Sequence, residues 1–121
     1  MDEQSFFFYI KNNNEHKMDS YIQIVLDYKE KIITVINLQS NKKNKEYATY
    51  LITYSAKLAF ENKIYKMVLD DCTNRYRKSN NLYLKLGLTY DDDFGPEMSG
   101  STEKIMNFKK VTKQPEILSY F

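Results

Sequence analysis

"KIITVINLQSNKKNKEYATYLI", residues 31–52, carries a strand pattern followed by a helix pattern. Residues 31–38 are nearly continuous in apolar side chains, which is typical of a central strand covered on both faces. A helix from Lys45 to Glu61 is predicted next, because one stripe at helical spacing holds Ala48, Leu51, Ile52, Ser55 and Ala59. Residues 63–70 form another apolar strand, so this strand–helix–strand order predicts a parallel pair with a right-handed crossover.

Shorter patterns surround this unit. Residues 5–11 and 21–28 predict strands, and the second of these should form a hairpin with residues 31–38. Asn44 and Asn62 are the expected caps of the first helix. A second helix, starting near Asp71 or Thr73, is expected from about Asn74 to Leu86 and should end at Gly87. A strand (88–92), a loop (93–101) and a last strand (103–111) complete an α/β (α+β) mixed sheet. We expect one domain, residues 1–121, with helices on both faces of the sheet.

Composition excludes several classes of protein. The 121 residues have a net charge of +2, which is too small for a clustered nucleic-acid footprint. The chain has no apolar run long enough to span a membrane, and its acidic start does not resemble a signal peptide. Its single cysteine excludes an internal disulfide and suits a reducing compartment, so we expect a soluble intracellular protein.

Three stretches together resemble the GCN5-related N-acetyltransferases: residues 31–52, "KIYKMVLDDCT" (63–73) and "NNLYLKLGL" (80–88). The family has a central strand, a Q/R-x-x-G-x-G/A loop and a helix, and its next helix ends in a pattern like "lYeklGF". Residues 82–88 match that ending closely, with Leu88 in place of Phe. In the loop, Lys43 stands at the basic position and Ala48 at the last small one, but Glu46 replaces the first glycine. The resemblance covers about residues 20–95, and the family's first strand and first two helices have almost no room here.

The resemblance implies acetyl-CoA as co-substrate and an amine as acceptor, either a small molecule or a protein lysine or N-terminus. The start of the first helix would present free N–H groups and a positive dipole end to the coenzyme A diphosphate. The implied acyl-CoA contacts are Ile36, Leu38, Lys43, Lys45, Glu46, Tyr47, Ala48, Thr49, Asn74 and Asn80. The alternative for this region is a solvated basic loop that caps a helix.

Tyr83 holds, by the same resemblance, the position of the group that protonates the leaving thiolate. Its alternative is a core aromatic on the helix stripe that also holds Tyr76, Ser79 and Leu86. The attacking amine also needs a base, for which Asp71 and its neighbour Asp70 are candidates; both could instead cap a helix.

The remaining reactive residues predict neither a metal site nor a nucleophilic cysteine. Cys72 has no histidine partner, because the only histidine, His16, lies in a distant Asn-rich segment. The acidic run at residues 91–93 is ordinary for a solvated loop.

Two hypotheses about function remain open. In the first, the domain is an N-acetyltransferase; in the second, it is a catalytically silent module that kept the fold. Glu46 and the short N-terminal part favour the silent module, whereas Tyr83 and its neighbours favour the enzyme. The aromatic strand "FFFYI" (6–10) also predicts an apolar surface that a second copy or another protein covers.

Overall fold

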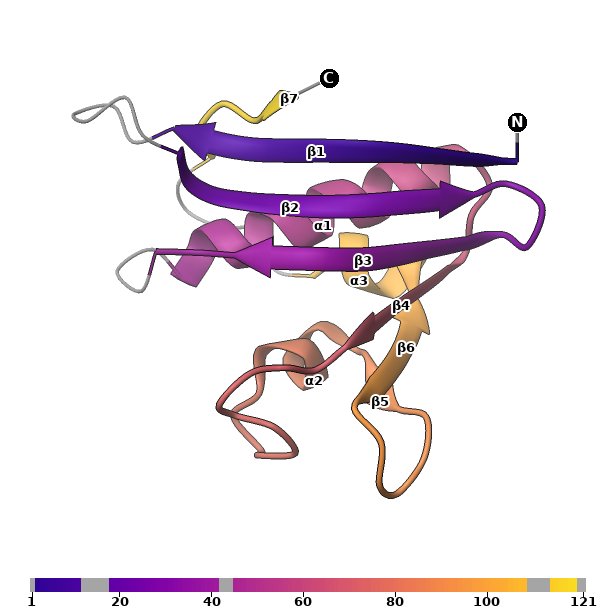
Figure 1. Ribbon diagram of the computed structural model, residues 1–121, viewed down its shortest axis with the longest axis vertical. Helices are drawn as coiled ribbons and strands as arrows, with labels where there is room; N and C mark the ends of the chain where they lie inside the picture. Colours follow the sequence, from indigo (N-terminus) through magenta and orange to yellow (C-terminus); the bar gives the residue numbers. More distant parts are fainter. Residues whose placement is uncertain (1, 12–17, 42–44, 109–113, 120–121) are drawn as a thin grey trace.

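A mixed sheet of seven strands organises the computed structural model, which describes residues 2–11, 18–41, 45–108 and 114–119 (Figure 1). The sheet order is β5-β6-β4-β3-β2-β1-β7. The strands are β1 (Glu3–Lys11), β2 (Met18–Asp27), β3 (Ile32–Gln39), β4 (Lys66–Asp70), β5 (Thr89–Tyr90), β6 (Glu97–Ser101) and β7 (Leu118–Ser119). The helices are α1 (Lys45–Glu61), α2 (Leu82–Leu86) and α3 (Thr102–Met106). None of the helices in these described ranges is long and apolar enough to cross a membrane.

The central strand–helix–strand prediction is confirmed. β3 and β4 are parallel neighbours, and α1 connects them across the sheet (Figure 1). The apolar stripe of α1 faces the sheet, because Leu51, Ile52 and Ala59 are completely buried there. The predicted hairpin is confirmed too, since β2 and β3 pair in antiparallel register from Tyr21–Gln39 to Asp27–Ile32.

The core lies on one face of the sheet. Alternate residues of each long strand are buried, and they join α1, α2 and α3 in one hydrophobic cluster. The strand residues of this cluster are Phe8, Ile10, Ile22, Ile24, Leu26, Ile33, Val35, Met67, Leu69 and Met98. On the opposite face of β1 and β2, Phe7, Tyr9, Tyr21 and Val25 are only half-buried. All the described helices therefore contribute to one face, which differs from the expectation of helices on both faces.

The second half of the chain corrects three sequence predictions. The predicted helix over 74–86 is only α2, and residues 74–77 form a turn in which Arg77 has a φ of 59°. Residues 97–101, predicted as loop, form β6 between β4 and β5. The strand predicted from residue 103 is helix α3, because Ser101 accepts the Lys104 N–H at 3.2 Å as N-cap and Ile105 then turns into the core. The rest of that predicted strand, from residue 109, lies outside the described residues.

The helix ends follow cap chemistry in most places. Gly87 ends α2 with a φ of 107°, as predicted, and its N–H bonds back into the helix. At the end of α1 the left-handed residue is Lys63, with a φ of 63°, not the predicted Asn62. Asn62 instead donates its side-chain amide to the Leu58 carbonyl at 2.8 Å. The predicted cap Asn44 lies outside the described residues.

Candidate functional site

β3 and β4 separate toward their carboxyl ends. Their register pairs run only from Ile32–Lys66 to Thr34–Val68, although β3 continues to Gln39 and β4 to Asp70. A β-bulge contributes to this separation: β2 pairs Gln23 with Asn37 and Ile24 with Val35, which leaves Ile36 as the extra residue. Diverging parallel strands open a crevice at the point where open α/β sheets bind ligands.

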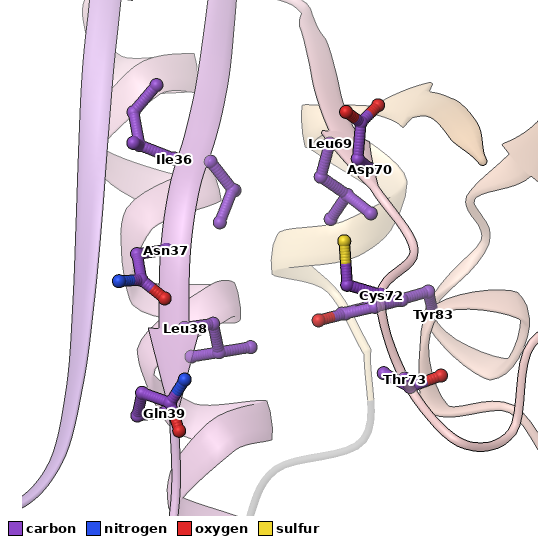
Figure 2. Close-up of a pocket in the computed structure, with 10 residues that line it drawn as sticks. Ile36, Asn37, Leu38, Gln39, Leu69, Asp70, Cys72, Thr73 and Tyr83 are labelled. Carbon is purple, nitrogen blue, oxygen red and sulfur yellow. The ribbon is translucent and has the colours of Figure 1, made fainter.

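A pocket of about 180 Å³ occupies this crevice (Figure 2). Its walls come from the separated ends of β3 and β4, from the segment after β4 and from α2. Lining residues are Val35, Ile36, Asn37, Leu38, Gln39, Leu69, Asp70, Cys72, Thr73 and Tyr83. A volume of this size holds a small acyl group and its thioester, but it is smaller than the roughly 300–1,000 Å³ typical of a complete drug-sized ligand. The rest of a large ligand would have to lie outside the pocket.

Tyr83 places a hydroxyl inside the pocket. Only 8% of the residue is exposed, yet its phenol oxygen has no hydrogen-bond partner among the described residues. Figure 2 shows this oxygen pointing from α2 toward β3, with the Cys72 sulfur beside the ring. Burial, helped by the nearby Asp71 and Cys72, raises the pKa of Tyr83 to about 12. The phenol is therefore protonated at neutral pH and can donate a hydrogen bond to a group in the pocket.

Asp71 is buried behind the pocket and is not one of its lining residues. Its carboxylate accepts four hydrogen bonds: from the Thr73 N–H at 3.0 Å, and from the Thr73 hydroxyl, the Asn81 amide and the Tyr90 hydroxyl at 2.6 Å each. Burial alone would raise the pKa of Asp71, but these hydrogen bonds outweigh it and lower the pKa below its ordinary value. A carboxylate that is this well satisfied and faces away from the pocket is poorly placed to take a proton from a substrate.

The predicted site residues that the structure describes lie in three places. Ile36, Leu38 and Tyr83 come together in the pocket. Tyr47, Ala48 and Thr49 lie in the first turns of α1 and help to cover the core, while Glu46 is exposed there. Asn74 and Asn80 are exposed in the segment before α2. Lys43 and the side chain of Lys45 lie outside the described residues.

Sequence reasoning missed several residues of the site. Asn37, Gln39 and Thr73 line the pocket, and Asn81 caps α2 by accepting the Tyr83 N–H at 2.8 Å. Only Asn81 carried a usable signal, since asparagine before an apolar run is a common N-cap. The others are polar residues in or beside a strand, and their role depends on the bulge and the strand separation.

Comparison with solved structures identifies the arrangement. An acetyltransferase from Bacillus cereus superposes on 82% of this chain and 71% of its own, with a TM-score of 0.58 at 14% identity. Tetrahymena GCN5 superposes on 84% of this chain and 69% of its own, with a TM-score of 0.57 at 16% identity. The chain has the GCN5-related acetyltransferase fold. The PaiA N-acetyltransferase from Thermoplasma acidophilum, solved in complex with coenzyme A, also shares this GCN5-related fold; the match covers 84% of this chain and 62% of that one, with a TM-score of 0.59 at 14% identity.

The GCN5-related fold is recognisable here through structure. No protein-family model matches the sequence, and no curated protein sequence matches it either. The structural matches confirm the fold expected from residues 31–52 and 80–88. At identities of 14–16% they carry the fold and not the activity.

Proposed function

We propose that the protein is an N-acyltransferase that moves an acyl group, acetyl in the first instance, from an acyl-CoA to an amine. The observation that carries the proposal is the Tyr83 phenol. It is buried, has no partner among the described residues and is aimed into the pocket where β3 and β4 separate. The hydroxyl at the pocket wall is therefore a hydrogen-bond donor available to an acceptor atom of a ligand.

The surroundings of the pocket suit an acyl-CoA. Past Thr34 no described strand pairs with the β4-facing edge of β3, so its backbone groups are available to the amides of the pantetheine arm. α1 begins after β3 at Lys45, and its first N–H groups favour the diphosphate. The small pocket then holds the acyl group and thioester next to Tyr83.

The reaction forms a carbon–nitrogen bond and breaks a carbon–sulfur bond. The amine attacks the thioester carbonyl, the thiolate of coenzyme A leaves, and the proton lost by the amine finally balances the one gained by sulfur. The pKa of Tyr83, about 12, is roughly 3.5 units above the value of about 8.5 for a thiol. Complete transfer of the phenol proton would therefore cost about 5 kcal/mol. Tyr83 acts mainly by donating a hydrogen bond to the sulfur as negative charge develops there.

The acceptor in this proposal is an amine that arrives as a cation. Asp70 is the only carboxylate among the residues that line the pocket, and it lies at the β4 rim. Glu97 stands opposite Asp70 in the β4–β6 register, and Asp91 is close to Glu97. Negative charge at this rim attracts an ammonium group, which must lose a proton before it attacks.

The alternative is a catalytically inactive module that kept the fold and serves as a binding or structural module. Glu46 favours this alternative, because it puts a negative charge in the first turn of α1, where a diphosphate would bind. The side chain of Glu46 is exposed in the structure.

Calorimetry and thermal shift with acetyl-CoA test the proposal. A ligand at 100 times its dissociation constant adds about 2.7 kcal/mol of stability, which raises the melting temperature by several degrees. Acetyl-CoA and CoA should both bind, whereas acetate should not. Absence of binding by both, in a folded sample, would leave the silent module as the better account. Transfer to an amine is then assayed by release of free thiol over a panel of small cationic amines and peptides.

A further inference from the structure

Asp71, Asn81 and Tyr90 form a polar cluster behind the pocket, in which Tyr90 is half-buried. Asp71 and Asn81 are 3% and 1% exposed, and the Asn81 amide and the Tyr90 hydroxyl both donate to the same Asp71 oxygen at 2.6 Å. A charge-assisted hydrogen bond of this length in a buried site is among the stronger polar contacts in proteins. Asp71 is not one of the residues that line the pocket, so these contacts act within the protein.

Asn81 links this cluster to Tyr83. Its side-chain oxygen accepts the N–H of Tyr83 at 2.8 Å and caps α2, while its amide nitrogen donates to Asp71 and to the Arg75 carbonyl. α2 has only five residues, so its own hydrogen bonds hold the helix weakly. The direction of the Tyr83 side chain therefore depends on the cap, and the cap depends on Asp71.

Arg77 holds the other side of the cluster. Its N–H donates to the Tyr90 hydroxyl at 2.6 Å, which turns the hydroxyl proton of Tyr90 toward Asp71. The Arg77 guanidinium lies 4.3 Å from the centroid of the Tyr90 ring and donates to the carbonyls of Asp92 and Gly95 at 2.9 Å each. The backbone of Arg77 is in the left-handed region, at a cost that these contacts offset. The segment before α2 and the loop before β6 are thus joined through one side chain.

We infer that Asp71 is a positioning residue, which acts through Asn81 to direct the Tyr83 phenol at the reacting sulfur. This role rests on the proposed acyl transfer and differs from that of a base, because Asp71 touches neither the pocket nor a substrate. A misplacement of about 1 Å at a reacting group can cost up to about 10²-fold in rate, so a rigid support for Tyr83 has a large effect on turnover.

A polarity swap distinguishes positioning from base catalysis. Asp71→Asn alone can place two amide N–H donors opposite each other at positions 71 and 81. Asn81→Asp alone places two carboxylates opposite each other, which repel. The double variant, Asp71→Asn with Asn81→Asp, restores one carboxylate and one amide with their places exchanged. The carboxylate at position 81 can still accept the Tyr83 N–H. We expect each single variant to lower kcat about tenfold or more with little change in the KM for acyl-CoA. The double variant should recover part of the loss, because it restores the contact between positions 71 and 81 but leaves the Arg75 carbonyl without its donor.

Other outcomes overturn the inference. A double variant as slow as Asp71→Asn, with the acid limb of the pH–rate profile lost in both, identifies Asp71 as a base. If all variants have the wild-type kcat when measured below their melting temperatures, the cluster only stabilises the fold.

A readout without substrate separates this inference from the proposed function. In free protein with ¹³C-labelled tyrosine, the Tyr83 resonance is assigned by its loss in Tyr83→Phe. We expect the resonance to shift or broaden in Asp71→Asn and to return toward its wild-type position in the double variant. If acyl-CoA does not bind at all, the proposed function fails, but this comparison still decides the positioning role. An unchanged Tyr83 resonance in every variant overturns it.

Discussion

Tyr83 and Tyr65 are both tyrosines, but one is buried and the other is exposed. Tyr83 is 8% exposed with its hydroxyl in the pocket, whereas Tyr65 is 54% exposed and packs edge-on against Phe60. Burial gives the Tyr83 phenol both its raised pKa and its fixed direction. The sequence predicted the position of Tyr83 through the pattern around Gly87, but Asn81 and Tyr90 were not predicted because their contacts join residues 9–19 positions apart.

Replacing Tyr83 by phenylalanine removes the hydroxyl and keeps the ring. We expect turnover to fall about 10²-fold or more, because the developing thiolate loses its donor, while acyl-CoA affinity stays near wild type. Steady-state kinetics and calorimetry measure the two quantities. Tyr65→Phe, which removes a hydroxyl far from the pocket, is the matched control. Equal turnover in both variants would show that Tyr83 is only a core aromatic.

Cys72 offers a chemical probe of the same pocket. Its thiol is exposed and lines the pocket beside Tyr83 (Figure 2). We expect iodoacetamide to modify Cys72 in the free protein, and bound acyl-CoA to slow this reaction because it covers the sulfur. Intact-protein mass spectrometry follows the modification, with Cys72→Ser as the control for selectivity. Equal rates with and without saturating acyl-CoA would mean that the ligand lies elsewhere.

At the scale of elements, long periodic segments were predictable and short ones were not. α1 was predicted with its observed bounds, Lys45–Glu61, because its apolar stripe repeats over several turns. α2, α3 and β6 have only five residues each, which is too short for a period to show. Their conformation comes from caps and from tertiary pairing: Ser101 caps α3, and β6 finds both of its partners at distant positions.

The first turn of α1 carries a testable conflict. The negative charge of Glu46 interacts favourably with the positive end of the helix dipole, which stabilises the fold by about 0.3–1 kcal/mol, but the same charge repels a diphosphate. We expect Glu46→Gln to tighten acyl-CoA binding with little loss of stability. Glu46→Gly should tighten binding as well, and should lower the free energy of unfolding by about 1 kcal/mol. Calorimetry and urea unfolding measure the two effects. Binding that neither variant improves would show that Glu46 does not oppose the ligand.

At the scale of the whole molecule, one cluster on one face of the sheet supplies the core. The sheet order was only partly predictable. The β1–β7 and β4–β6 pairs join segments that are distant in the sequence, and the pattern of one segment does not indicate which other segment it pairs with. Stability also depends on Asp71, whose hydrogen bonds reach three separate segments. The lowered pKa of its carboxyl makes this contribution dependent on pH.

The sign of this dependence follows from the direction of the shift. The pKa of Asp71 lies below its ordinary 3.8 in the folded protein, so the unfolded chain takes up the proton first as the pH falls. The contribution of Asp71 is therefore complete above about pH 5 and is lost as the pH falls below about 4. We expect urea unfolding to show wild type more stable than Asp71→Asn at pH 6, and the difference to shrink toward pH 3. A difference that is constant with pH would contradict the assigned hydrogen bonds.

On the face of the sheet opposite the core, β1 and β2 present an apolar surface that we predict a partner covers. Phe8 and Ile10 are buried in the chain's own core, so only the alternate residues of β1 present an apolar surface. There Phe7 stacks on Tyr21 with ring centroids 5.1 Å apart, and Tyr9 lies beside them. We predict concentration-dependent self-association in sedimentation velocity, abolished by Phe7→Lys. A monomer at every concentration would remove a second copy as the covering partner.

β3 and β4 pair with each other over only a short stretch. Three register pairs, Ile32–Lys66 to Thr34–Val68, connect the β1–β3 side of the sheet to the β4–β6 side (Figure 1). α1 and α3 also lie against each other. A ligand that binds between the two strand ends would form hydrogen bonds with β3 in the place of a neighbouring strand. Among residues 35–39, the amides that face the crevice should then exchange with deuterium fast in the free protein and slowly in the complex, whereas those that pair with β2 should exchange slowly in both.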